Sequence, residues 1–116
     1  DTDIWLFDLS TKKDKSVVPE NPRNISNRKG YDNQPSFSAD GKQIYYASMQ
    51  GTQTDIYCYD IRKKKQTPVS KSSESEYSPV LWPGGPYLSA VVVEKDSAQK
   101  IHLVDPQTGA THKVLP

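Results

Sequence analysis

Short runs of apolar residues alternate with polar residues along the whole chain, and turn-forming residues separate the runs. The clearest example is residues 34–38 (QPSFS), which are followed by the turn-forming residues 39–41 (ADG) and then by residues 44–47 (IYYA). Alternation with a period of two indicates strands, and a glycine after Asp supplies the positive φ that a tight hairpin needs. No apolar set keeps a helical spacing over several turns, and nine prolines interrupt the chain. The pattern therefore predicts strands and no helix.

The pattern repeats along the chain. Residues 78–82 (SPVLW) align with residues 34–38 at an offset of 44, and residues 83–86 (PGGP) supply a turn where ADG stands in the first copy. Three other strand-like runs end in an aspartate, and these are residues 3–8 (DIWLFD), 55–60 (DIYCYD) and 100–105 (KIHLVD), at offsets of 52 and 45. Since an aspartate side chain can bond the backbone two residues on, Asp8, Asp60 and Asp105 are expected to cap the turns that follow.

Each period reads as four short strands. They are expected at about 34–38, 43–49, 55–61 and 67–70 in the middle copy, at 77–82, 87–93, 99–104 and 112–115 in the next copy, and at 3–8 and 16–18 in the piece that comes first. A repeated unit of four strands and about forty to fifty residues is typical of a β-propeller, whose blades stack around a central channel. The apolar and aromatic side chains of the strands are therefore expected to pack between blades.

The predicted fold class is all-β, with β-propeller blades of four antiparallel strands in an incomplete ring. Residues 1–30 are expected to supply the last two strands of a preceding blade plus a linker, residues 31–72 a complete blade, and residues 73–116 a second, degenerate blade. Because propellers need about four to eight blades, we expect this sequence to be a fragment of a larger propeller. The remaining blades of the same protein would then be a partner of this segment and would close the ring. Assembly of several copies of this chain into a ring is the alternative.

The repeat resembles a known family. Residues 35–46 (PSFSADGKQIYY), with DIYCYD at 55–60, are similar to the TolB-type β-propeller repeat, in which a proline precedes serine, a small residue or proline, Asp-Gly-Lys, a strand, Ile-Tyr and an aspartate. Ala39 stands where proline is usual, and the later copy keeps Pro79 but has WPGG at 82–85 in place of the Asp-Gly turn. The resemblance covers nearly the whole chain and is specific for the repeat, while it says little about function.

The resemblance implies two functions. The first is a non-catalytic protein-binding or scaffold module of a TolB-like bacterial envelope protein, periplasmic or outer-membrane-associated, that holds an envelope lipoprotein or a peptide at one face of the propeller. The second is a propeller domain that gates a prolyl oligopeptidase-like peptidase, with its catalytic domain outside this segment. A Gly-x-Ser-x-Gly string elsewhere in the gene would favour the second, and a peptidoglycan-binding or tetratricopeptide segment the first.

Composition narrows the possible chemistry. The net charge of +1, from 15 basic and 14 acidic residues, gives no electrostatic reason to expect nucleic acid or an anionic membrane as partner, and no apolar run approaches a membrane span. The single cysteine, Cys58, excludes an internal disulfide, and the two histidines, His102 and His112, match no metal-ligand spacing with it. No Gly-x-Ser-x-Gly or phosphate-binding loop is present. We therefore expect no catalytic residues, no metal site and no cofactor in this sequence.

Two sets of residues are candidates for binding. The loops that lead into the innermost strands should converge on the mouth of the channel. They combine tyrosines with acidic or amide groups, a mixture suited to recognition of a partner. The candidate residues are Tyr31, Asp32, Asn33 and Gln34 in one blade, and Glu74, Glu76 and Tyr77 in the next. Packing of the tyrosines between blades is the alternative. The second set consists of basic residues at 12–15 (KKDK) and 62–65 (RKKK). They are interpreted either as solvated turns or as a basic rim that recruits an acidic protein or glycan.

Overall fold

The structure is a computed structural model that describes residues 2–70, 72–83 and 85–114. All its regular elements are strands, as the sequence pattern predicts, and no helix occurs in these ranges. The strands are β1 (Trp5–Thr11), β2 (Val17–Asn24), β3 (Tyr31–Phe37), β4 (Gln43–Gln50), β5 (Gln53–Asp60), β6 (Lys65–Pro68), β7 (Ser75–Leu81), β8 (Leu88–Val93), β9 (Gln99–Val104) and β10 (Thr111–Lys113).

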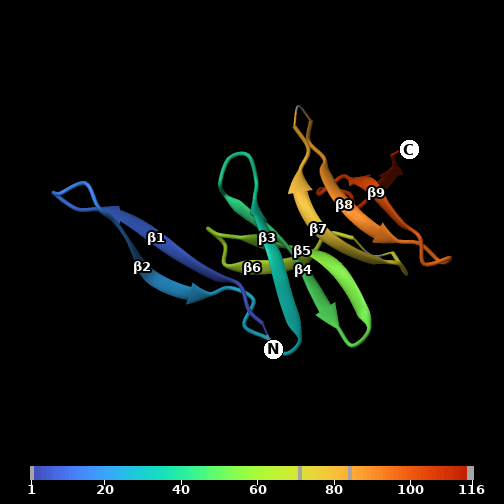
Figure 1. The fold of residues 1–116 in the computed structure, drawn as a ribbon, viewed down its shortest axis with the longest axis horizontal. Coiled ribbons are helices and arrows are strands. Elements are labelled where there is room, and N and C mark those ends of the chain that lie inside the picture. Colours follow the sequence, from blue (N-terminus) through green and yellow to red (C-terminus); the bar gives the residue numbers. More distant parts are fainter. Residues whose placement is uncertain (1, 71, 84, 115–116) are drawn as a thin grey trace.

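The strands form three separate antiparallel sheets. Strands β1 and β2 make a hairpin, β3 to β6 make a four-stranded sheet in chain order, and β7 to β10 make a second one in chain order. We refer to them as the first, second and third blades. Figure 1 shows the first blade as a hairpin that projects away from the two complete sheets. The predicted all-β architecture of four-stranded antiparallel blades is confirmed.

The second blade is buried on both faces, which explains its continuous apolar run. Residues 44–48 (IYYAS) of β4 are all buried. The register pairs Ile44 with Tyr59 on one face and Tyr45 with Cys58 on the other, so successive residues of β4 point into different blade interfaces. A strand with neighbours on both faces needs apolar residues at consecutive positions rather than at alternate ones.

Two apolar clusters fill the two interfaces of the second blade. The cluster towards the first blade consists of Ile4, Ile25, Ile44, Tyr46 and Tyr59, and the cluster towards the third blade consists of Tyr45, Ile56, Cys58, Val69, Leu88, Ala90 and Val104. Full burial of an isoleucine, leucine or valine side chain in these clusters stabilises the fold by about 1.5–3 kcal/mol relative to leaving it exposed. Stacking of blades thus supplies the apolar core, as a propeller requires.

The first blade departs from the predicted strand limits. Strand β1 extends three residues past Asp8, so this aspartate lies inside the strand and does not cap a turn as expected. Its two carboxylate oxygens instead accept hydrogen bonds from Arg23 Nη2 and Asn21 Nδ2 on β2, both at 3.0 Å. The prediction of an aspartate cap is therefore wrong for the first blade.

The two other aspartates behave as predicted. Asp60 Oδ1 accepts a bond from the Lys63 N–H at 2.8 Å, and Asp105 Oδ1 accepts one from the Gln107 N–H at 2.9 Å. Both bonds close the turn that joins the third and fourth strands of a blade. Two other expectations reach beyond the described residues: Gly84 of the predicted 83–86 turn, and Leu115 at the end of the predicted strand 112–115.

Cys58 gives a test of this packing. The thiol lies in the cluster between the second and third blades, and burial raises its pKa to about 11, with a smaller contribution from Asp60. Because burial disfavours the thiolate, Cys58 is expected to stay protonated and unreactive towards Ellman's reagent from pH 7 to pH 9, and to react only as the protein unfolds. Thiol labelling of the native protein beside a urea-unfolded control measures this, and native labelling that speeds up with pH as the control does would contradict it.

Candidate functional site

The structure places the predicted binding residues in strands, not in loops. Residues 31–33 pair with residues 47–49 of β4, and residues 75–77 pair with residues 91–93 of β8. Only Glu74 precedes its strand, β7. The expectation that these residues form loops is wrong, because pairing within each blade starts directly after the segment that joins it to the preceding blade.

The two inner carboxylates of the predicted set are buried. Asp32 is 1 % exposed and Glu76 is 0 % exposed. Asp32 Oδ1 lies 3.5 Å from Arg28 Nη2, and Ser72 Oγ donates to Glu76 Oε1 at 2.6 Å, so each carboxylate contacts a residue four positions earlier in the chain. Neither carboxylate is available to a partner at the surface, which corrects the sequence-based expectation for Asp32 and Glu76.

Gln34 is exposed, and its side chain links the second and third blades. Both β3 and β7 contain a bulge, and the bulge residues Gln34 and Ser78 have positive φ values of 56° and 52°. The N–H of Ser78 donates to Gln34 Oε1 at 2.8 Å, so the side chain of one bulge satisfies the backbone of the next. This bond fixes the distance between the first strands of the second and third blades.

Three of the predicted residues line one hollow. Tyr31 and Asn33 of β3 and Tyr77 of β7 surround a space of about 230 Å³ together with Met49 of β4 and Thr54 of β5. Tyr31, Met49 and Thr54 stand opposite one another across three neighbouring strands. The hollow thus lies where the first strands of the second and third blades come together, and Tyr31 is 48 % exposed at this site.

Thr54 supplies an unsatisfied polar group in this hollow. The residue is 2 % exposed, and its Oγ1 has no hydrogen-bond partner among the described residues. A buried hydroxyl without a partner costs about 1–3 kcal/mol, so a group that enters the hollow and bonds to Oγ1 would recover that cost. The two tyrosines and Met49 provide apolar walls around it, which is the usual composition of a recognition pocket.

Met49 and Thr54 are the residues that the sequence analysis missed. Gly51, with a φ of 63°, sits in the turn between β4 and β5, and Gln50 pairs with Gln53. Counting outward from a two-residue turn at 51–52 puts Met49 opposite Thr54. The turn glycine was therefore a usable signal for placing both residues beside Tyr31.

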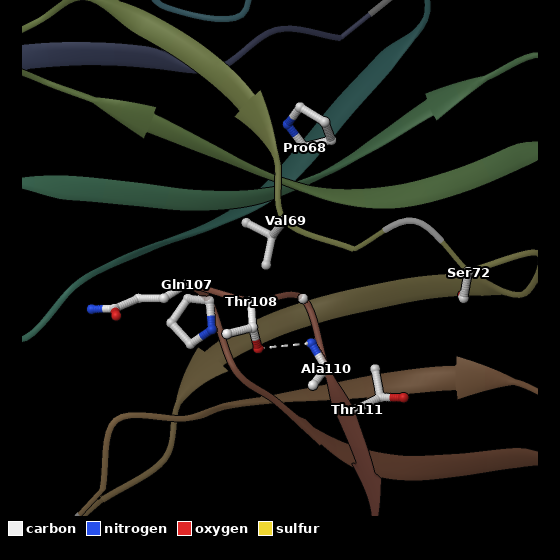
Figure 2. Close-up of a pocket in the computed structure, with 9 residues that line it drawn as sticks. Pro68, Val69, Ser72, Gln107, Thr108, Ala110 and Thr111 are labelled. Atoms are coloured by element: carbon white, nitrogen blue, oxygen red, sulfur yellow. Dashed lines mark hydrogen bonds between the residues drawn. The ribbon is translucent and has the colours of Figure 1, made fainter.

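A larger hollow of about 520 Å³ lies near the outer strands. Figure 2 shows it between the second blade, at Pro68 of β6 and Val69 directly after that strand, and residues 107–111 of the third blade. Two of its hydroxyl groups are already engaged, because Thr108 Oγ1 accepts from the Ala110 N–H and Ser72 Oγ donates to Glu76 Oε1. None of the described residues that line it is charged. We interpret this hollow as a gap between blades and not as a recognition site.

Neither a metal-binding cluster nor a membrane-spanning helix occurs among the described residues. In the described ranges no three His, Cys, Asp or Glu side chains come close enough to hold a metal ion. His102 lies in β9, where its Nε2 is 3.5 Å from Glu94 Oε2. None of the described secondary structure is a helix with the length and hydropathy of a membrane span.

Comparison with known proteins identifies the fold. No protein-family model matches the chain, and no curated protein matches it in sequence. Two solved structures are similar to it: a protein from Agrobacterium tumefaciens assigned as TolB, with a TM-score of 0.70 and 20% identity over 86% of this chain, and TolB from Acinetobacter baumannii, with a TM-score of 0.67 and 19% identity over 98%. The chain spans 36% and 26% of those two chains. These likenesses confirm the TolB-like propeller fold.

Proposed function

We propose that this chain is part of a non-catalytic propeller module that binds a protein partner through the hollow formed by Tyr31, Asn33, Met49, Thr54 and Tyr77. The module would belong to a TolB-type protein of the bacterial envelope, periplasmic or outer-membrane-associated, with blade boundaries near 30/31 and 72/73. The observation that carries the proposal is the buried Oγ1 of Thr54, which lies between two tyrosines and a methionine and has no hydrogen-bond partner in the part of the chain that the structure describes.

The size of the hollow favours a protein partner over a small molecule. Small-molecule pockets usually measure about 300–1,000 Å³, and this hollow of about 230 Å³ is smaller. It has room for one protruding side chain of a larger surface, such as a residue from a peptide or an envelope lipoprotein. Tyrosine and methionine are enriched at protein interfaces, where an aromatic anchor and its pocket carry most of the binding energy.

The tyrosine at the hollow gives the first test. Peptides that bind the full-length protein can be selected from a random display library and their affinities measured by calorimetry. Replacing Tyr31 by alanine is expected to weaken the selected peptides by at least about tenfold, because the exposed ring would be an anchor residue of the interface. Phe37→Ala is the matched control, since Phe37 is a 56 % exposed aromatic residue on the same strand but outside the hollow.

A second variant separates polar from apolar recognition. Thr54→Val keeps the shape of the side chain and removes only the hydroxyl, so it should weaken peptides that bond to Oγ1 while leaving the fold intact. The proposal fails if selected peptides bind equally to wild type, Tyr31→Ala and Thr54→Val. It also fails if Phe37→Ala weakens binding as much as Tyr31→Ala does.

A further inference from the structure

Basic residues gather at the turns of the first two blades. Lys42 follows the turn between β3 and β4, and Arg62, Lys63, Lys64 and Lys65 follow β5. The N–H of Ile61 donates to the carbonyl of Lys42 at 3.1 Å, so these two turns lie side by side. The turn between β1 and β2 joins the corresponding strands of the first blade and carries Lys12, Lys13 and Lys15. We name these eight residues the basic rim, and they make up more than half of the chain's 15 basic residues.

The charge of the basic rim is left largely unpaired by the protein. All eight side chains are exposed, and within the described ranges only Lys12 has a carboxylate within ion-pair distance, Glu20 Oε1 at 3.1 Å. The nearby aspartates are held by their own turns: Ser16 bonds Asp14, Ser38 bonds Asp40, and both bonds hold the pKa of those carboxyls below the usual range. The rim therefore presents a group of basic side chains to the solvent.

Two lysines of the rim occupy backbone positions that favour glycine. Lys15 and Lys64 have φ values of 69° and 57°, in the left-handed region that an L residue adopts at a cost. The third blade has Gly109 at the position of Lys64, and both turns close with the same bond, from the Lys64 N–H to Asp60 O at 2.8 Å and from the Gly109 N–H to Asp105 O at 2.7 Å. At this position the second blade thus has an exposed charge where the third blade has the less strained glycine.

The basic rim also ends abruptly. The corresponding turn of the third blade, residues 105–110 (DPQTGA), has no basic residue. A flat anionic membrane would meet the turns of every blade at this end, whereas a narrow ligand would meet only some of them. The rim contains seven lysines and one arginine, and flexible lysine charges suit several separate carboxylates better than one bidentate contact.

From these observations we infer that the basic rim is a docking surface for an extended acidic polypeptide segment, rich in Asp and Glu, that lies along the outer turns of the first two blades. Figure 1 shows the β1–β2 hairpin standing clear of the complete sheets, so its tip is open to such a segment. The surface is separate from the hollow around Tyr31, and binding there does not depend on the proposed function of the hollow.

The test uses the full-length protein and a synthetic peptide of alternating Glu and Ser. The triple variant Arg62→Gln, Lys63→Gln and Lys65→Gln is expected to weaken peptide binding by at least about tenfold at an ionic strength of about 0.15 M. The matched control is Lys29→Gln, Lys95→Gln and Lys100→Gln, which removes the same charge outside the rim and should change the affinity by less than about twofold. Tyr31→Ala should leave binding of this peptide unchanged.

A single variant separates charge from structure. Lys64→Gly should weaken peptide binding and at the same time raise the urea midpoint of unfolding, because it relieves the left-handed backbone. The inference is overturned if the peptide does not bind the wild type, if the rim variant and the control variant bind it equally well, or if vesicles of phosphatidylglycerol bind to the rim while the acidic peptide does not.

Discussion

Replacing Arg28 by methionine is expected to lower the free energy of unfolding by about 3–5 kcal/mol. The Arg28 guanidinium lies 4.1 Å from the centre of the Tyr57 ring and donates to Ser48 Oγ at 2.6 Å. It also lies 3.5 Å from Asp32 Oδ1, and the Asp32 side chain is completely buried. Methionine keeps much of the apolar volume but leaves the carboxylate of Asp32 in the protein interior without a cation.

An exposed ion pair provides the control for this prediction. Arg23 pairs with Asp8 at 3.0 Å, but the side chains are 36% and 57% exposed. Because water screens such a pair, Arg23→Met should cost no more than about 1 kcal/mol. Urea denaturation followed by tryptophan fluorescence measures both variants. Equal losses for Arg23→Met and Arg28→Met would contradict the prediction.

A double variant identifies the source of the loss. Asp32→Asn in the Arg28→Met background replaces the unpaired carboxylate by a neutral group of the same shape, so part of the lost stability should return. The recovery follows because breaking a buried pair costs more than replacing both partners. Asp32 is the neighbour of Tyr31 on β3, and the ion pair therefore also supports one wall of the proposed recognition hollow.

The alternation of apolar residues made the blades predictable from sequence. The run at 44–47 lies within β4 and the Asp-closed run at 55–60 lies within β5, where periodicity and turn residues agree. The first hairpin was harder to predict because Pro19 and Pro22 interrupt the apolar run after residue 18. Strand β2 nevertheless continues to Asn24, since an edge strand has unpaired positions where a missing N–H costs little.

The candidate site is only partly predictable from the sequence, because its polar residues are typical of loops although all of them except Glu74 lie in strands. Side chains of a strand alternate between its two faces, so Tyr31 and Asn33 point one way and Asp32 the other. Gly30, with a φ of 108°, marks the turn that comes directly before β3. This signal indicates that the strand starts at Tyr31, and therefore which of its residues share a face. The missing partner of Thr54 Oγ1 depends on packing between blades, and no local pattern in the sequence reports it.

A substitution at the contact between the second and third blades is expected to lower the free energy of unfolding about as much as loss of the buried ion pair does. A Cβ atom on Gly109 would lie 2.5 Å from the carbonyl oxygen of Val69, a buried residue of the core cluster between these blades. Gly109→Ala is therefore expected to lower the free energy of unfolding by about 2–5 kcal/mol. About 1–2 kcal/mol comes from the left-handed backbone at a φ of 76°, and the rest from the displaced contact.

Gly41→Ala separates these two contributions to the Gly109 effect. Gly41 has a φ of 70°, but no atom lies within 4 Å of the position that its Cβ would take. This variant should lose only the backbone contribution of about 1–2 kcal/mol, and the difference between the two variants in urea denaturation then measures the contact with Val69. Equal losses would show that the blades do not approach each other closely at Gly109. Lys64 holds the corresponding place in the second blade, so the close approach that requires glycine belongs to the junction of the second and third blades.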